Sequence, residues 1–281
     1  VLGRKITMGD LYIVSTPIGN LKDITFRAVD TFKEVDLILS EDTRVTKKLL
    51  NHLGIKRRIY SLNEHNEVKK TPKIIQQLLQ GRSVALASDA GTPLISDPGY
   101  CLVRQARKNF INVVPIPGCS AAITALSVSG IPTDKFYFHG FLSSSAPLKL
   151  RELDKLAQRK ETLIFYESVH RLQSTIGHMI KVFGGYRKAI FCKEMTKLHE
   201  SYLGDNLSEI DEFLKSNPNK MRGEFTIIIE GSKQEQVMID QNKIDKILLE
   251  LLSEMSIKKA VKICVVVSGF SRNEIYKRAV K

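Results

Sequence analysis

The stretch that most constrains the fold is residues 88–100, a loop dense in glycine, proline and aspartate. It directly follows Ser83–Ala87, a short apolar run that is typical of a buried parallel strand. In an open α/β sheet, ligands bind at the carboxyl ends of the strands, because loops and helix N-termini meet there. Gly91 allows close backbone approach, and Asp89 and Asp97 bring two carboxylates to the same rim. We therefore expect this loop to hold a ligand, although an ordinary strand-to-helix turn would use the same residue types.

Two further loops of this kind follow apolar strands. Thr16–Asn20 comes after a predicted strand at residues 10–14, and Pro117–Ala121 comes after one at residues 111–115. Helical patterns separate these strands from one another and from two more predicted strands, at residues 35–40 and 58–62. The alternation predicts an α/β fold with a parallel sheet, in which all three loops share one edge.

Helix boundaries in this half are marked by glycine and proline. Gly54 and Gly81 are predicted to end two of the helices, because glycine readily adopts the left-handed conformation of a helix C-terminus. Thr71 followed by Pro72 predicts a helix start, with Pro72 in the first helical position and the helix running to Gln80.

The second half continues the alternation and then changes character. Strands are predicted at residues 136–141, 162–166, 188–193 and 222–230, with helices between them, and residues 231–241 form a polar linker. Residues 243–281 carry helical apolar stripes and resemble a helix-turn-helix. For a chain of 281 residues we expect two or three domains, which we assign as an α/β domain at 10–131, an α/β domain at 132–232 and a basic three-helix unit at 243–281.

Positive charge is concentrated in the C-terminal unit and is high overall. The formal net charge is +13, which favours a polyanionic partner unless it reflects a compositional drift toward lysine. Within residues 257–281 a single acid, Glu274, stands against the following basic residues: Lys258, Lys259, Lys262, Arg272, Lys277, Arg278 and Lys281. This unit therefore either contacts phosphates or presents a solvated basic face on a dimerisation element.

Several classes of protein are disfavoured by missing patterns. Neither a Walker loop nor a Gly-x-Gly-x-x-Gly fingerprint is present, and the histidines do not have metal-ligand spacing, so we expect no metal site. No apolar run reaches the roughly 18 residues of a membrane helix, so we expect no membrane association. The four cysteines are scattered, which is typical of a reduced, cytoplasmic protein.

Six motifs, taken in order, resemble the tetrapyrrole methylase superfamily, and within it the ribose methyltransferases of small-subunit rRNA. The motifs are Leu11–Leu21, Glu41–Arg44, Asp89–Gly99, Pro117–Ala122, Phe165–Arg171 and Lys193–Lys197. The resemblance runs from Asp10 to the end of the chain, including the basic helical tail. It departs from the usual pattern at Cys119, where proline is common, and at Lys193, where arginine is common.

The resemblance implies a fold, an activity and a set of cofactor contacts. The fold would be two α/β domains with the cofactor in the cleft between them, usually as a homodimer. The activity would be S-adenosylmethionine-dependent methylation of the ribose 2′-hydroxyl of a cytidine in the decoding region of 16S rRNA, free or within the 30S subunit. The implied cofactor contacts are Pro17, Ile18, Ala90, Gly91, Thr92, Ile95, Ser120 and Ala121, with weaker matches at Tyr166, Glu167 and Met195.

Methylation of a neutral hydroxyl also needs a place for the proton. A base or a charge-stabilising group should lie within hydrogen-bond reach of the hydroxyl, unless positioning alone accelerates the reaction. The candidates at predicted strand ends are Glu41, Asp42, Arg44, His65, Lys193 and Glu194, among which the sequence does not choose. Asp42 and Thr43 could equally serve to cap the following helix.

The sequence is also compatible with two other functions. A methyltransferase for a small tetrapyrrole-like molecule would share the α/β body, but the basic C-terminal unit and the net charge argue against it. A nucleic-acid binder without enzymatic activity would use the tail for RNA and the body as a ligand sensor.

Overall fold

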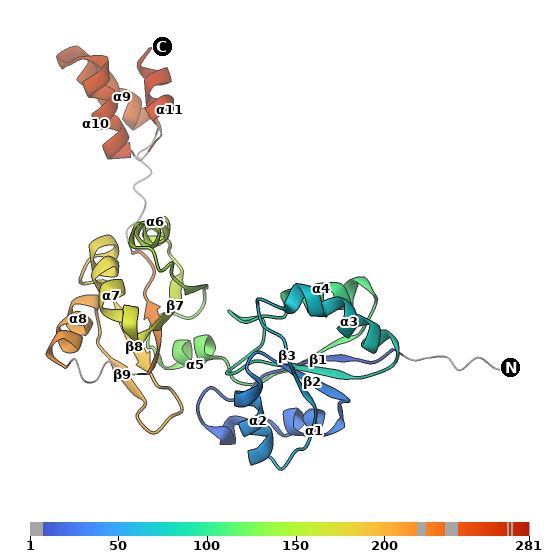
Figure 1. Ribbon diagram of the computed structural model, residues 1–281. Helices are drawn as coiled ribbons and strands as arrows, with labels where there is room; N and C mark the ends of the chain where they lie inside the picture. The colour runs from blue at the N-terminus through green and yellow to red at the C-terminus, as the bar shows by residue number, and fades with distance from the viewer. Residues whose placement is uncertain (1–7, 218–222, 234–240, 269, 271, 281) are drawn as a thin grey trace. The chain divides into compact units, whose positions relative to one another are not determined.

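The computed structural model describes residues 8–217, 223–233, 241–268, 270 and 272–280 (Figure 1). Their contacts divide the chain into two compact units, and the boundary in the sequence lies between residues 231 and 232. The first unit contains two five-stranded sheets, one in each half of its sequence. The boundary expected at residues 131 and 132 lies between these sheets, and the division into three domains stays a prediction.

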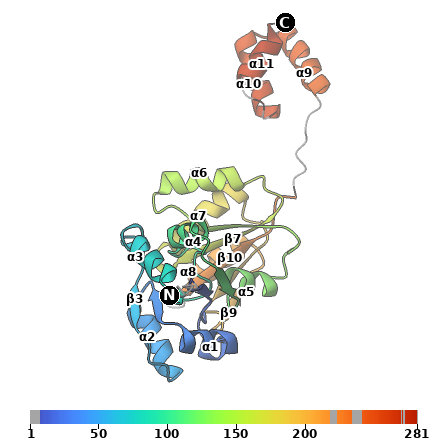
Figure 2. The ribbon, with the colours of Figure 1, turned by 90° about the vertical axis from the view of Figure 1, so that its right-hand side faces the viewer.

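The first sheet is parallel throughout, with strand order β3-β2-β4-β1-β5. Its strands are β1 (Leu11–Val14), β2 (Leu37–Ser40), β3 (Ile59–Ser61), β4 (Val84–Ala87) and β5 (Val113–Ile116). Both faces are covered: α1 (Phe26–Glu34) and α2 (Thr43–His52) lie on one side, α3 (Glu67–Leu79) and α4 (Tyr100–Lys108) on the other (Figures 1 and 2).

The central strand, β4, shows why both faces of the sheet are buried. Val84 and Leu86 pack with α3 and α4, whereas Ala85 and Ala87 pack with α1 and α2. Because successive side chains of a strand point to opposite faces, a continuous apolar run fills both layers. The prediction of a buried parallel strand at this position is confirmed.

The three glycine- and proline-containing loops follow β1, β4 and β5, which are neighbours in the sheet. All three therefore leave the carboxyl edge at adjacent positions, as the sequence predicted. Thr25 caps α1 by accepting a hydrogen bond from the N–H of Ala28 (3.1 Å). Gly54 follows α2 with a φ of 67°, as predicted for the end of that helix.

The predicted start of α3 at Pro72 is wrong. The helix begins at Glu67, and Pro72 lies inside it. Asn63 and Asn66 each accept a hydrogen bond from the backbone N–H of the other (3.2 and 3.1 Å), which builds a turn immediately before Glu67. The buried Glu67 carboxylate then accepts a hydrogen bond from the N–H of Leu102 in α4 (3.1 Å). These tertiary contacts extend the helix beyond the local proline signal.

The second sheet is mixed, with strand order β6-β7-β10-β8-β9. Its strands are β6 (Phe136–Phe141), β7 (Thr162–Ser168), β8 (Ala189–Lys193), β9 (Ser201–Leu203) and β10 (Glu224–Ile229). β6 and β7 are parallel, and β10 is antiparallel to both β7 and β8. The sequence did not reveal β9, a three-residue edge strand that pairs with β8.

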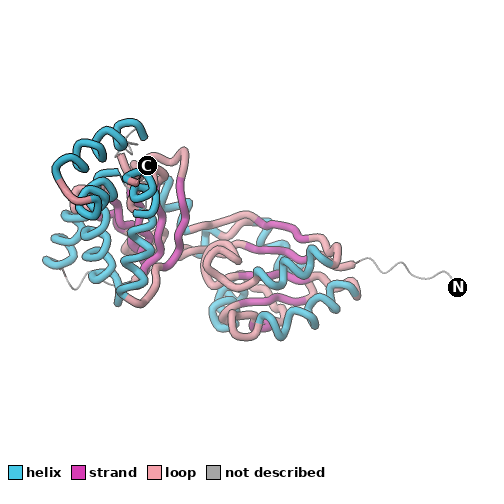
Figure 3. The backbone as a smooth tube through the Cα atoms, turned by 90° about the horizontal axis from the view of Figure 1, so that it is seen from above, coloured by secondary structure: helices cyan, strands magenta, loops and turns pink. Residues whose placement is uncertain are grey.

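The second sheet has helices on both faces, seen beside its strands in Figure 3. α6 (Ala146–Leu156), α7 (Val169–Phe183) and α8 (Leu207–Ser216) pack on the face formed by Leu163, Phe165 and their neighbours. The opposite face, which includes Ile164 and Ile228, packs against α5 (Ala121–Val128) and Ile18 from the first half of the unit. This shared core joins the two sheets and brings their loops together.

The second unit consists, in its described part, of α9 (Gln241–Glu254), α10 (Ile257–Ser268) and α11 (Arg272–Ala279). Its core contains Ile244, Leu248, Val261 and Ile275, as the helical stripes predicted for the first two helices. Part of the predicted polar linker, residues 234–240, lies outside the described residues. None of the described helices is long and apolar enough to cross a membrane.

Candidate active site

A cleft of about 540 Å³ lies between the carboxyl edge of the first sheet and the second sheet. Its walls combine the loop after β4, the start of α5, the end of β7, the loop after β8 and the start of β10. The lining residues are Ile18, Asp89, Ala90, Gly91, Thr92, Ile95, Ser96, Asp97, Ser120, Ala121, Phe141, Tyr166, Glu167, Ser168, Val169, His170, Glu194, Met195, Gly223, Glu224, Phe225 and Thr226. The volume lies within the range typical of small-molecule sites.

Hydrogen bonds join the three loops at the sheet edge into one structure. The backbone N–H groups of Thr16 and Gly91 each donate to the other residue's carbonyl oxygen (2.9 and 3.0 Å). The Thr92 hydroxyl donates to the carbonyl oxygen of Cys119 (3.0 Å) and shares a further hydrogen bond with the Ser15 hydroxyl. The φ of 86° at Gly91 lies in the left-handed region that favours glycine. These hydrogen bonds hold the backbone at the floor of the cleft in a fixed conformation before any ligand binds.

All the predicted cofactor contacts except Pro17 line this cleft. Pro17 lines a smaller adjoining hollow of about 280 Å³, which shares Ile18, Asp89 and Ala90 with the cleft. Residues more than seventy positions apart in the sequence are thus brought to one cavity. Their roles in binding remain predictions.

Tyr166 connects the two halves of the cleft. Its hydroxyl accepts a hydrogen bond from the backbone N–H of Ala122 in the first turn of α5 (3.1 Å). Its ring makes T-shaped contacts with the rings of Phe138 and Phe141, at centroid distances of 5.1 and 5.6 Å. Burial raises the pKa of the phenol, so Tyr166 stays protonated and acts as a fixed wall.

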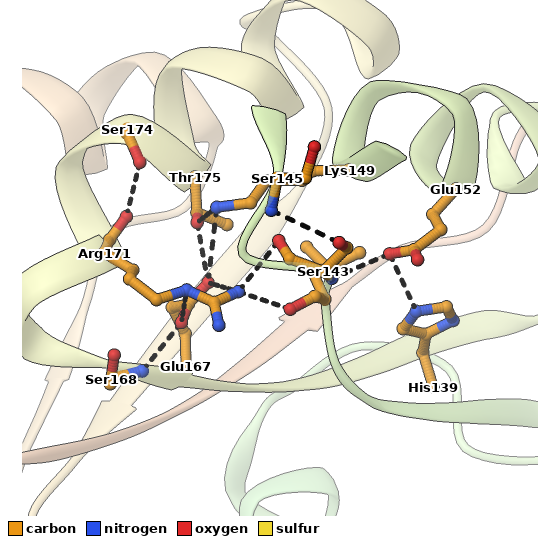
Figure 4. A network of polar contacts seen from close by, with 11 residues as sticks. His139, Ser143, Ser145, Lys149, Glu152, Glu167, Ser168, Arg171, Ser174 and Thr175 are labelled. Carbon is orange, nitrogen blue, oxygen red and sulfur yellow. Dashed lines mark hydrogen bonds and ion pairs between the residues drawn. The ribbon is translucent and has the colours of Figure 1, made fainter. Parts of the chain in front are cut away.

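Glu167 is 2% exposed, and its carboxylate belongs to an internal network (Figure 4). The Thr175 hydroxyl and the Ser168 N–H donate to it (2.6 and 2.9 Å), and Lys149 and Arg171 form ion pairs with it (3.9 and 3.2 Å). Arg171 also donates to the carbonyl oxygens of Leu142 and Ser143, directly after β6. The network fixes the wall that carries Phe141.

Three acidic residues gather at the carboxyl ends of β2 and β4. Burial is the largest cause of the raised pKa of Asp97, which reaches about 7, with further contributions from Glu41 and Asp89. Burial also raises the pKa of Asp89 and of Glu41, and repulsion from the Asp89 carboxylate raises the pKa of Glu41 further. Asp89 and Asp97 line the cleft, so it combines an apolar wall with an acidic rim in which the pKa of Asp97 is about 7.

Of the six predicted proton-handling residues, Glu194 alone is among the lining residues. Burial would raise its pKa, but the backbone N–H of Glu224 and the Lys197 ammonium, each 2.9 Å from Glu194 Oε1, lower it. Asp42 caps α2 by accepting from the N–H of Arg44 (2.8 Å), and pairs with the Arg44 guanidinium. The prediction of a capping role for Asp42 is confirmed.

The other candidates lie away from the lining of the cleft. Arg44 lines a different hollow, next to β3. Glu41 is half-buried directly after β2, His65 is exposed in the turn before α3, and Lys193 ends β8. Asp89 and Asp97 were recognised as rim carboxylates in the sequence but were not among the proton-handling candidates. The loop motif contained both residues, and their position in the lining of the cleft distinguishes them from Glu41.

Comparison with known proteins identifies the family to which this cleft belongs. Residues 10–211 match the family model for tetrapyrrole (corrin/porphyrin) methylases, and residues 239–281 match the model for the RsmI C-terminal HTH domain. Ribosomal RNA small subunit methyltransferase I of Pasteurella multocida is 47% identical over 270 residues, which cover 95% of each chain. The protein of that name from Escherichia coli O157:H7 is 42% identical over 275 residues, covering 98% of this chain and 96% of its own.

The chain belongs to the ribosomal RNA small subunit methyltransferase I family of tetrapyrrole methylases. The family resemblance drawn from the motifs is confirmed, as is the fold of α/β type with a C-terminal helical unit. Among solved structures, uroporphyrin-III-C-methyltransferase from Thermus thermophilus is similar with a TM-score of 0.57 at 18% identity, covering 79% of this chain and 94% of its own. Diphthine synthase gives a TM-score of 0.58 at 13% identity, covering 78% of this chain and 89% of its own. These two likenesses concern the fold.

We expect Asp97 to lower the free energy of unfolding, because its carboxylate is partly buried beside the cleft. Its pKa is raised from 3.8 to about 7, so burying the carboxylate disfavours folding increasingly between these two pH values and by a constant amount above them. Replacing Asp97 with asparagine should therefore raise the free energy of unfolding more at pH 8 than at pH 5. Urea unfolding at the two pH values measures this, and an equal change at both would contradict it.

Proposed function

We propose that this protein transfers the methyl group of S-adenosylmethionine to the ribose 2′-hydroxyl of a cytidine in the decoding region of 16S rRNA. The observation that carries the proposal is the near-complete alignment with proteins named ribosomal RNA small subunit methyltransferase I, which extends through the C-terminal unit. The small-molecule alternative has no need of such a basic unit.

The cleft residues suit S-adenosylmethionine. Bound there, the cofactor would supply an electrophilic methyl group on a positively charged sulfonium. Ile18, Ile95 and Met195 offer apolar surface, and Gly91 adds no side chain to the cleft. Asp89 and Asp97 provide the negative charge that favours a cationic ligand. We assign the predicted cofactor contacts on this basis, with Glu167 acting through the network that holds the cleft wall.

Asp97 is our candidate for the proton acceptor. A general base is most effective when its pKa is close to the working pH, and burial brings the pKa of Asp97 to about 7. Glu194 is a weaker base because Lys197 and the Glu224 N–H stabilise its charge. Asp97→Asn should lower kcat by about 10²-fold or more if Asp97 takes the proton. Glu194→Gln is the matched comparison; an unchanged kcat for Asp97→Asn would favour positioning without a base.

The deciding experiment is to map ribose methylation on small-subunit rRNA, free and assembled into 30S particles, after incubation with the protein and labelled S-adenosylmethionine. We expect one cytidine to be methylated. A protein that binds RNA but not the cofactor by calorimetry would be a non-enzymatic binder. Cofactor binding with methylation of a tetrapyrrole but not of RNA would favour the small-molecule reading.

We further propose that the protein works in the cytoplasm as a homodimer and that the C-terminal unit grips RNA. Five of its basic residues, Lys258, Lys259, Lys262, Arg272 and Lys277, are exposed, whereas Arg278 pairs with Asp245 (3.1 Å). Leu249 and Tyr276 are exposed as well, which suits the alternative role in dimerisation.

Deleting residues 240–281 separates these two roles. The unit has its own core, so the remaining chain should fold and keep its affinity for S-adenosylmethionine. We expect RNA methylation to fall sharply and the salt dependence of RNA binding to decrease by about one unit per lost phosphate contact. Sedimentation of the truncated protein measures the oligomeric state. An unaltered salt dependence together with loss of the dimer would assign the unit to dimerisation.

A further inference from the structure

A second large hollow, of about 1010 Å³, lies beside the edge strand β3 and α2. We refer to it as the basic groove. Its lining residues are Asp36, Leu37, Thr43, Arg44, Lys47, Leu50, Asn51, Ile55, Lys56, Arg57, Arg58, Ile59, Tyr60, Gln77 and Arg82. Six of these are cationic and one is acidic. All six cationic residues are exposed.

The charge in the basic groove is largely uncompensated. Its single acid, Asp36, accepts hydrogen bonds from the N–H and hydroxyl of Ser83 (2.7 and 3.0 Å). Arg44 pairs with Asp42. In the part of the chain that the structure describes, no ion pair joins the other five cations to a carboxylate. A concave surface with this charge attracts polyanions.

Cations along an edge strand have an ordinary explanation, since they discourage pairing with another sheet. That explanation does not account for the cations of the basic groove, because they come from several segments and not from the edge strand alone. Arg44 and Lys47 come from α2, Lys56–Arg58 from the turn before β3, and Arg82 from the segment before β4, two strands away from the edge. Charge from three separate segments converges on one hollow. The side chain of Tyr60, which is 50% exposed, adds an aromatic surface of the kind that stacks on bases.

The basic groove is linked to the cleft by direct contacts. Arg44 lines the groove and pairs with Asp42. The backbone N–H of Asp42 donates to the carboxylate of Asp89, which lines the cleft (3.0 Å). Both hollows belong to the first unit, and the short segment after β2 separates them. An RNA strand whose nucleotide entered the cleft would meet Arg44 beyond this segment, and the groove continues from there toward the amino ends of β2, β3 and β4, where Lys56–Arg58 and Arg82 lie.

We propose that the basic groove binds the phosphate backbone of the RNA that flanks the target nucleotide. The proposal rests on the proposed function as an rRNA methyltransferase and adds an RNA-binding surface on the α/β body, separate from the C-terminal unit. The cations of the groove bind phosphates, and Tyr60 stacks on an unpaired base. The Asp42–Arg44 pair lies between the groove and the cleft. Contact with phosphates is independent of sequence, so this surface contributes affinity and register.

The test compares two triple variants of the full-length protein. The groove variant carries Lys47→Gln, Lys56→Gln and Arg58→Gln. The control carries Arg104→Gln, Lys108→Gln and Lys181→Gln, which remove the same charge from exposed positions on α4 and α7 outside the groove. Binding of a decoding-region RNA fragment is measured over a salt series, cofactor affinity by calorimetry, and particle mass by light scattering.

We expect the groove variant to bind RNA more weakly and to lose about two to three units of salt slope relative to the control, at about 0.7–0.9 per phosphate. Cofactor affinity should not change. Equal affinities and slopes for the two variants would overturn the proposal, and increased mass with unchanged RNA binding would assign the charges to protection of the edge strand. The proposed function fails separately, if the parent protein binds RNA through the groove but methylates none.

Discussion

Glu167→Gln is expected to destabilise the first unit by about 3–5 kcal/mol, because it removes the acid from a buried ion-pair network. Lys149 is 2% exposed, and its charge would lose its principal partner, as would that of Arg171. Burial lowers the pKa of Lys149, and the Glu167 carboxylate opposes this shift, so its removal would disfavour the charged ammonium further. Urea unfolding of the full chain, followed by a signal from the first unit, measures the loss.

A matched control is Glu152→Gln in the same region. The Glu152 side chain is 34% exposed, accepts a hydrogen bond from the Ser143 N–H (2.9 Å) and lies 3.7 Å from the ring of His139. Its neutralisation should cost less than about 1 kcal/mol, because burial lowers the pKa of His139 and so weakens any charge on the ring, and the amide oxygen of glutamine can still accept from the Ser143 N–H. If the two substitutions had equal effects on unfolding, the network around Glu167 would not have the structural importance that we assign to it.

Gly91→Val is expected to weaken S-adenosylmethionine binding by at least tenfold. Valine is strained at a φ of 86°, by at least about 1–2 kcal/mol, and relief of this strain would displace the backbone that bonds to Thr16. A Cβ atom at this position would meet Ile18 Cγ2 at 3.5 Å and the Cys119 carbonyl oxygen at 3.7 Å, which are ordinary contacts. The expected effect therefore comes from backbone conformation and from the branched side chain entering the cleft.

Gly54→Val isolates the effect on the cleft. Gly54 has a φ of 67°, and its Cβ would meet no atom within 4 Å. It follows α2 and is not among the cleft residues, so the variant has similar backbone strain without a change in the site. We expect both variants to lose stability and only Gly91→Val to lose cofactor affinity, as measured by calorimetry. Equal affinities for the cofactor would show that the loop after β4 does not hold it.

The sequence by itself determined the layout of the first sheet and the position of its loops. Apolar runs such as residues 84–87 fill both faces of a parallel sheet, and parallel strands must place their following loops at one edge. The motifs also identified the family, which the comparisons confirm. These features depend on local pattern and chain direction, both of which can be read along the sequence.

The tertiary structure decided what depends on contacts between distant segments. α3 starts five residues before Pro72, where an asparagine turn and the bond from Leu102 to Glu67 hold it. Burial and two neighbouring carboxylates raise the pKa of Asp97 to about 7, and these contacts form only in the folded chain. Glu167 is occupied by Lys149 and Arg171, and the basic groove draws charge from three segments. Burial, ion pairing and surface shape arise from packing, so the same residue types acquire different roles only once the chain has folded.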